Sequence, residues 1–135
     1  MKHFILAALV GVLVSGPASS TTFICDTKGA YDIKNGEVVP SKTKYSDLIA
    51  WPKVVFDDVS GLFKYGKKDR WTEEKMVVTQ KGSKSGSASG HYMHNGAIFS
   101  AINVYSWKIP IEFQWLGGGN SALMTGTCTH YGNLE

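Results

Sequence analysis

The chain has 135 residues, 43% of them hydrophobic and 19% charged, and 14 Lys and Arg against 11 Asp and Glu give a formal net charge of +3. This length fits one domain with a sizeable core. So small a net charge argues against nucleic-acid binding unless the basic residues are concentrated in one patch. The densest basic cluster is interrupted by Asp69 and is predicted to be a solvated loop; its members are Lys64, Lys67, Lys68 and Arg70.

The first twenty residues have the pattern of a secretory signal peptide. A basic start at residues 1–3 precedes an apolar run from Phe4 to Val14, and Ala18 and Ser20 suit the −3 and −1 positions of a cleavage site. The apolar run is shorter than the roughly 20 residues that cross a bilayer. We therefore expect no transmembrane segment after signal cleavage.

Cleavage after Ser20 would leave a single β domain over residues 21–135, with residues 1–20 as the signal peptide. The mature domain would have 115 residues and, without Lys2, a formal charge of +2. We expect it to be secreted or periplasmic.

The two cysteines, Cys25 and Cys128, stand near opposite ends of this domain. Exported thiols meet an oxidising environment in which a disulfide persists. A bond between them would span 103 positions and close almost the whole mature chain. Because neither belongs to a Cys-x-x-Cys motif, we predict a structural disulfide rather than a redox site.

Two Asn-Gly dipeptides, at residues 35–36 and 95–96, favour the positive φ angles of two-residue hairpin turns. The first predicts a hairpin of residues 30–34 with 37–40, and the second a hairpin of residues 89–94 with 97–107. These are the strongest local signals in the chain.

The remaining strands are predicted from alternation and turn residues. Ile109, Ile111, Phe113 and Trp115 alternate with polar or proline positions, so we expect a strand there with these side chains facing the core and Pro110 at its edge. Further strands are predicted over residues 23–27, 54–57, 62–65, 75–80 and 122–130.

Four connections between these strands have recognisable sequence signals. Residues 59–61, Val-Ser-Gly, predict a turn, and residues 117–120, Gly-Gly-Gly-Asn, a loose connection. Residues 44–50 could form a short helix that Trp51-Pro52 would end. The polar residues 81–90 predict a flexible loop between strands.

Together these elements predict an all-β fold of about eight short antiparallel strands. Their local, hairpin-type connections favour a small up-and-down barrel or a curved meander over a Greek-key sandwich. Because Cys25 and Cys128 lie in the first and last predicted strands, the disulfide would pair these two strands and close the sheet. A sandwich could meet the same distance across its core, so that alternative stays open.

A compact group of metal-ligand side chains lies at His91, Met93 and His94. In a strand, His91 and Met93 share one face while His94 points to the other. Imidazole and thioether ligands suit copper better than zinc. The two ligands on one face, His91 and Met93, do not complete a metal site. Periplasmic copper binding therefore remains an alternative hypothesis, and the sequence predicts no cofactor.

No catalytic residues are predicted. The adjacent carboxylates Asp57 and Asp58 would point to opposite faces of a strand, which prevents their acting as an acid–base pair. Residues 82–86, Gly-Ser-Lys-Ser-Gly, are out of register with a Gly-x-Ser-x-Gly nucleophile elbow. The chain is therefore not expected to be an enzyme.

Aromatic residues give the better indication of a binding surface, because a barrel this small cannot enclose four tryptophans and six tyrosines. Trp51 and Trp71 are the preferred candidates, since both lie outside the regular alternations. A ligand in the barrel lumen is less favoured, because side chains alone fill a barrel of eight short strands.

Two segments resemble the periplasmic and membrane-bound inhibitors of c-type lysozyme. Residues 23–26, Phe-Ile-Cys-Asp, are similar to the aromatic-x-Cys-Asp at that family's mature start, and residues 88–92, Ala-Ser-Gly-His-Tyr, to its inhibitory loop. The chain lacks the arginine of that loop and the family's Trp-x-Lys-Gly pattern. The resemblance implies a small exported β-barrel in which Ser89 would enter the lysozyme cleft; Tyr92, also a candidate binding residue, lies one position earlier than in the family pattern.

The leading hypothesis is thus a monomeric, non-catalytic, secreted or periplasmic β-barrel that binds an unidentified protein or glycan. The alternatives are an inhibitor of a lysozyme-like cell-wall hydrolase and a periplasmic copper-binding protein. Ligand identity is not encoded in any motif that we can identify.

Overall fold

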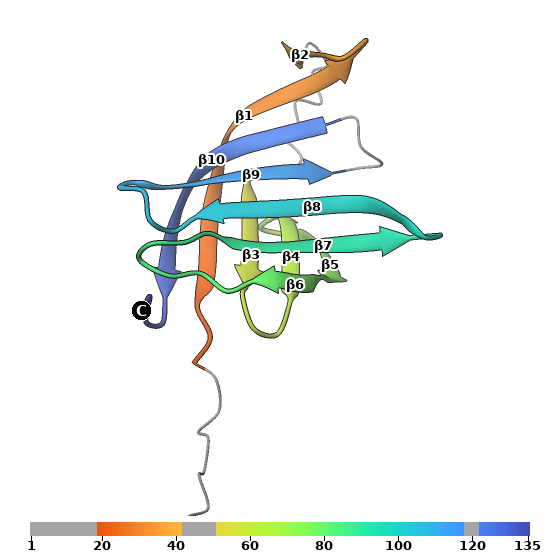
Figure 1. Ribbon diagram of the computed structural model, residues 1–135. Helices are drawn as coiled ribbons and strands as arrows, with labels where there is room; N and C mark the ends of the chain where they lie inside the picture. The colour runs from red at the N-terminus through yellow and green to blue at the C-terminus, as the bar shows by residue number, and fades with distance from the viewer. Residues whose placement is uncertain (1–18, 42–50, 118–121) are drawn as a thin grey trace, which may run out of the picture.

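Ten antiparallel strands form one sheet in the computed structural model, which describes residues 19–41, 51–117 and 122–135 (Figure 1). These ranges contain no helix. The strands are β1 (Thr22–Lys34), β2 (Glu37–Pro40), β3 (Lys53–Asp57), β4 (Leu62–Lys67), β5 (Arg70–Lys75), β6 (Val77–Gln80), β7 (Ala88–His94), β8 (Ala97–Tyr105), β9 (Ile111–Gly117) and β10 (Ala122–Tyr131).

The sheet is a nearly closed barrel with the order β5-β4-β3-β1-β10-β9-β8-β7-β6, and β2 pairs with the outer half of β1. If β2 is left out, neighbouring strands in the barrel wall are also consecutive along the chain. The β1–β10 pair is the exception, because it joins the first strand to the last. The first and last strands pair, as their cysteines predict. The predicted all-β, up-and-down barrel is therefore confirmed.

The two ends of the strand order, β5 and β6, are joined directly through Met76. This residue is 2% exposed, and its N–H donates to the Gly61 carbonyl at 2.8 Å. β5 pairs with β4 and β6 pairs with β7, so they act as one strand bent at Met76. With that strand counted once and β2 set aside, the barrel wall has eight strands, in agreement with the prediction.

Both Asn-Gly turns have the predicted geometry. Asn35 and Gly36 have φ angles of 54° and 80°, and Asn95 and Gly96 have φ angles of 49° and 78°. The predicted strands 23–27 and 30–34 are one continuous β1, because a bulge between Thr27 and Gly29 absorbs the break in alternation.

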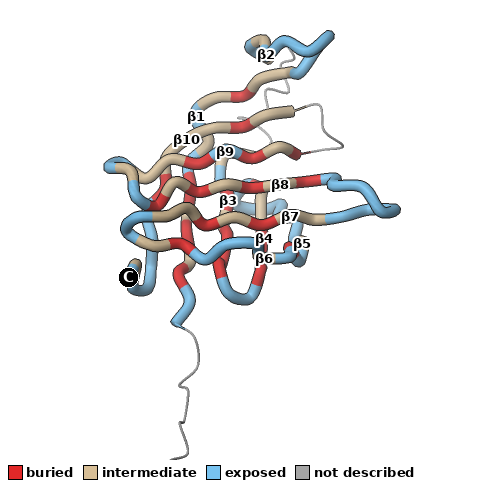
Figure 2. The backbone as a smooth tube through the Cα atoms, viewed as in Figure 1, coloured by how far each residue is buried: buried red, intermediate tan, exposed pale blue. Residues whose placement is uncertain are grey.

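Apolar side chains from β1, β3, β4 and β7–β10, together with Met76, fill the barrel interior, and Figure 2 marks the buried positions along the backbone. Trp115 is 1% exposed, and its indole N–H donates to the Ser100 hydroxyl at 2.8 Å, so its polar atom is satisfied inside the core. The other fully buried large residues are Phe23, Phe56, Phe63, Phe113 and Met124.

One predicted core position is wrong. Phe113 and Trp115 face the core as the alternation predicts, but Ile109 is 100% exposed. The strand begins only at Ile111, after Pro110, so Ile109 belongs to the preceding turn and its side chain is not held to the strand's inner face.

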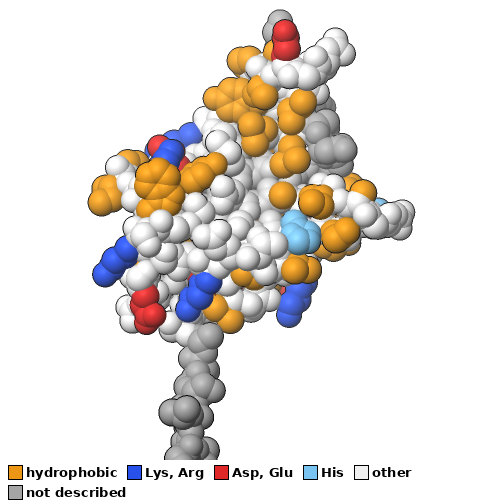
Figure 3. All heavy atoms as spheres, in the orientation of Figure 1, with side chains coloured by type: hydrophobic (Ala, Val, Ile, Leu, Met, Phe, Trp, Pro, Cys, Tyr) orange, Lys and Arg blue, Asp and Glu red, His pale blue; other side chains and the backbone are white. Residues whose placement is uncertain are grey.

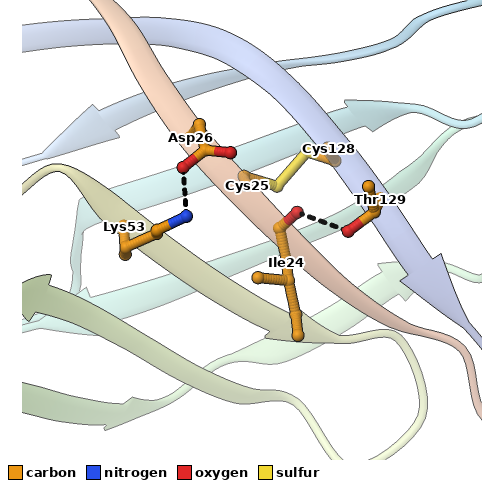
Figure 4. The surroundings of a disulfide bond; sticks show 6 residues. All are labelled: Ile24, Cys25, Asp26, Lys53, Cys128 and Thr129. Carbon is orange, nitrogen blue, oxygen red and sulfur yellow. Dashed lines mark hydrogen bonds and ion pairs between the residues drawn. A yellow bond between two sulfur atoms is a disulfide. The ribbon is translucent and has the colours of Figure 1, made fainter.

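The disulfide joins direct partners in the β1–β10 ladder (Figure 4). The Cα atoms of Cys25 and Cys128 are 3.9 Å apart, closer than the 4.4 to 6.8 Å expected of a disulfide and than the about 4.5 Å typical of directly opposed residues in an antiparallel ladder. Both are buried. An ion pair between Lys53 and Asp26 lies beside the bond on the solvent side.

Two adjacent aspartates organise the end of the barrel where β1 begins. Asp58 is 1% exposed, and its carboxylate accepts from the Thr21 N–H at 2.7 Å and from the Gly82 N–H at 2.9 Å. It thereby ties the start of β1, the β3–β4 turn and the β6–β7 loop together.

Asp57 closes the β3–β4 turn itself. Its carboxylate accepts from the Ser60 N–H at 2.7 Å, the Val59 N–H at 3.1 Å and the Thr22 hydroxyl at 2.9 Å. Burial acts to raise the pKa of this carboxyl, but the hydrogen bonds outweigh burial and hold the pKa below its usual 3.8.

A carboxyl whose pKa is lowered on folding stabilises the fold above its unfolded-state pKa, and this stabilisation is lost as the pH falls through the folded-state pKa. We therefore expect Asp57→Asn to destabilise the protein at neutral pH and the difference from wild type to shrink below about pH 4. Urea unfolding of both proteins between neutral pH and below about pH 4 measures this difference in the free energy of unfolding. The exposed Asp69→Asn is the control, and a difference that stays constant with pH would contradict the assignment.

Three predicted segments lie outside the described residues: the signal peptide up to residue 18, the helix over residues 44–50 and most of the glycine-rich connection at 117–120. Within the described part of the chain, no helix has the length and hydrophobicity to span a membrane.

Candidate functional site

The outer face of β7–β10 carries a row of uncharged polar side chains. Ser89 pairs with Asn103, Asn103 with Gln114, and Gln114 with Thr125, so the four residues cross four neighbouring strands in register. Each lies between inward-facing neighbours, which directs its side chain outward. We call these four residues the neutral row. With adjacent strands about 4.8 Å apart, it extends about 14 Å across the sheet.

A second outward row runs beside it through Tyr105, Glu112 and Thr127. The Tyr105 hydroxyl donates to the Gln114 side-chain oxygen at 3.0 Å, which links the two rows. Between them on β9 and β10 lies an open hollow of about 280 Å³, lined by side chains of both rows. The hollow therefore combines an aromatic ring, a carboxamide, a carboxylate and hydroxyl groups.

The turn between β8 and β9, which we call the Trp107 turn (residues 106–110), projects from the end of these rows. Trp107 is 50% exposed and Ile109 is 100% exposed. The Tyr105 and Trp107 rings meet edge to face at 6.4 Å, and the Lys108 ammonium lies 4.9 Å from the centre of the Tyr105 ring. Figure 3 shows hydrophobic and basic side chains together on this projection.

The Trp107 turn is held by its buried first residue. Ser106 is 6% exposed, accepts from the Ser83 N–H at 3.2 Å and donates to the Ser83 carbonyl at 2.8 Å. The Lys108 N–H donates to the Tyr105 carbonyl at 3.0 Å. The turn is thus fixed to the predicted loop 81–90, which becomes part of the same surface.

An apolar row lies on the other side of the neutral row. Strand register places Val77, His91, Ala101, Leu116 and Leu123 side by side on the outer face, and the row continues through β1 to β2 at Tyr31 and Pro40. Hydrophobic side chains extend over this face from β2 downward in Figure 3.

The predicted metal-ligand residues are divided between two faces. His91 and Met93 follow the outward alternation of β7, whereas the His94 ring packs 6.0 Å from Phe99, on the side of Tyr92. Within the described residues, no group of three or more His, Cys, Asp or Glu side chains could hold a metal ion. The copper site remains a prediction from sequence.

The two tryptophans preferred from sequence occupy different environments. Trp51 packs against Tyr65 at 5.5 Å and Trp115 at 5.6 Å, so it covers the core. Trp71 is 45% exposed on β5, away from the neutral row. Tyr65 belongs to the same aromatic cluster as Trp51, and burial together with the nearby Glu74 carboxylate raises its pKa to about 12.

Ser89 and Tyr92, singled out by the resemblance, both lie in β7 but on opposite faces. Ser89 is in the neutral row, and its hydroxyl accepts from the Thr79 hydroxyl at 3.1 Å. Tyr92 packs against the core and the Phe99 ring. The polar loop predicted over residues 81–90 ends at Ser87, because β7 begins at Ala88, so Ser89 lies in a strand and not in the loop.

Sequence reasoning did not single out Tyr105, Trp107 or Gln114 as binding residues, although the alternation around Phe113 predicts Gln114 on the outer face. Residues 97–107 were predicted as one strand, but the strand ends at Tyr105 and the following residues form a turn. The sequence Ser-Trp-Lys-Ile-Pro before a strand was the available signal, because proline cannot donate to the ladder.

Neither the protein-family models nor the curated proteins contain a match to this chain.

Proposed function

We propose that this protein is a non-catalytic, exported binding domain that contacts its ligand through the Trp107 turn and the adjoining outer face of β7–β10. The observation that carries the proposal is the exposure of Trp107 and Ile109 on a turn whose base, Ser106, is buried and hydrogen-bonded. The disulfide supports export, because such bonds persist in oxidising compartments.

The Trp107 turn has the properties of an interaction anchor. Tryptophan and tyrosine are enriched among residues that dominate binding energy, and a preorganised turn loses little conformational entropy on binding. Trp107 and Ile109 supply contact area without any titratable group, which suits recognition rather than bond-breaking chemistry.

A second candidate function is inhibition of a lysozyme-like cell-wall hydrolase. The Trp107 turn and the loop before β7 are joined by hydrogen bonds between Ser106 and Ser83, so both would contact an enzyme as one unit. The resemblance of residues 23–26 and 88–92 to lysozyme inhibitors supports the same partner class.

Calorimetric titration with a c-type lysozyme and with neutral trisaccharides tests both candidates, and a lysozyme activity assay distinguishes inhibition from binding. We expect Trp107→Ala to weaken binding at least about 30-fold, the effect of losing a hot-spot residue. The matched control is Trp71→Ala, which removes an exposed tryptophan elsewhere on the barrel.

The outcomes separate the candidates. Lysozyme activity unaffected by micromolar protein would remove the inhibitor function, as would equal inhibition by wild type and Ser89→Trp. Equal binding by wild type and Trp107→Ala, or no binding of either ligand class, would overturn the binding proposal.

A further inference from the structure

We infer that the outer face of β7–β10 binds a neutral oligosaccharide, with one sugar ring in the hollow beside Tyr105 and the chain running along the neutral row. This inference rests on the proposed function and names its ligand class. It begins from the strand register, which aligns Ser89, Asn103, Gln114 and Thr125 across the sheet.

The hydrogen-bonding groups of the two rows match those of a sugar. Sugar hydroxyls both donate and accept, so they pair with carboxamides and with hydroxyl side chains. The Gln114 oxygen already accepts from Tyr105, which leaves its amide nitrogen to donate to a ligand. Gln114 is exposed, and Asn103 and Thr125 are half-buried, so their side chains are accessible and held by the sheet.

Aromatic rings at the end of the face complement the other part of a sugar. One face of a pyranose ring consists largely of C–H groups, which pack against an aromatic ring. Tyr105 lines the hollow directly, and Trp107 extends the aromatic surface beyond it. The edge-to-face contact at 6.4 Å orients the two rings relative to each other.

The charges on this face favour a neutral ligand. The neutral row contains no ionisable side chain, and the carboxylate that lines the hollow, Glu112, is ion-paired with Lys108. The charges of Lys108 and Glu112 offset each other, so no unpaired cation of this pair is left to attract a phosphate, sulfate or carboxylate group. The Glu112 carboxylate can still accept hydrogen bonds from sugar hydroxyls.

The dimensions favour a short chain of linked rings. The hollow of about 280 Å³ lies just below the usual size of pockets for drug-sized ligands, which suits a single ring. From the hollow, which Gln114 and Thr125 line, the neutral row continues across the sheet to Asn103 and Ser89, two strand spacings or about 10 Å, so further rings would lie over these side chains.

The test is a calorimetric titration of the disulfide-intact protein with cellotriose, maltotriose and triacetylchitotriose, together with amide chemical-shift mapping. We expect at least one trisaccharide to bind and Gln114→Ala to weaken that binding at least tenfold. Shift changes should concentrate at Asn103, Gln114 and Thr125. Asn133→Ala, which removes an exposed carboxamide outside the face, should bind as wild type.

No binding of any trisaccharide at millimolar concentration would overturn the inference, as would binding that Gln114→Ala leaves unchanged. If the protein binds c-type lysozyme through Trp107 but none of the sugars, the sugar inference fails and the proposed binding function stands. If it binds neither, both fail. A heparin disaccharide that binds more tightly than every neutral sugar would also contradict the inference.

Discussion

Replacing both Cys25 and Cys128 with alanine is expected to lower the free energy of unfolding by about 4 to 5 kcal/mol. The bond closes a loop with a sequence separation of 103, and in the chain-entropy model so long a loop restricts the unfolded chain strongly. This is about a quarter or more of the roughly 5 to 15 kcal/mol by which domains are typically stable. Urea unfolding of the oxidised protein and the double variant measures the difference.

The control for this experiment is reduction of the wild-type protein, which breaks the bond but keeps both cysteine side chains. Reduced wild type and the double variant should unfold at similar urea concentrations. A loss of less than about 1 kcal/mol would show that the β1–β10 ladder, and not the covalent restraint, holds the first and last strands together.

Replacing Asp58 with alanine is expected to destabilise the protein by about 3 to 5 kcal/mol, because two charge-assisted hydrogen bonds are lost and the Thr21 and Gly82 N–H groups lose their acceptor inside the protein. Urea unfolding gives the magnitude. Hydrogen exchange of these two amides shows whether the start of β1 and the β6–β7 loop are released together.

Asp58→Asn is the matched variant, since its one side-chain oxygen can keep one of the two hydrogen bonds. It should be destabilised less than Asp58→Ala. Equal stability of Asp58→Ala and wild type would mean that the β3–β4 turn and the β6–β7 loop hold their positions without this carboxylate.

The sequence predicts those parts of the fold that depend on local conformation or on a covalent bond. The Asn-Gly turns require positive φ, which few residues adopt readily, so they identify two hairpins directly. The cysteines identify the pairing of the first and last strands because a disulfide limits the distance between them.

β5 was not predicted, and the reason is physical. Nearly all of its side chains are exposed, so it has no alternation of apolar and polar residues. It is held by its ladder with β4 and by pairs such as Lys64–Glu73 at 3.0 Å. These partners come from the preceding strand, and a cluster of charges alone does not distinguish a hairpin from a solvated loop.

The candidate site depends on register, which is why sequence reasoning found only part of it. Ser89 was singled out, but its alignment with Asn103 and Gln114 exists only once three strands are paired. Trp51 was expected at the surface because no alternation surrounds it, yet its ring covers Trp115. Whether a large aromatic side chain is exposed depends on the tertiary packing around it and not on its neighbours in the sequence.

The bend at Met76 has a mechanical consequence for the barrel. In the strand order the disulfide-linked pair β1–β10 lies near the middle, while β5 and β6 lie at the two ends and are joined by the chain at Met76. The disulfide therefore lies on the opposite side of the barrel from the β5–β6 junction at Met76. We expect fluctuations that widen the barrel to open at the β5–β6 junction and to pivot about β1 and β10, so that β3 and β9, the neighbours of this pair, move less than β4 and β7.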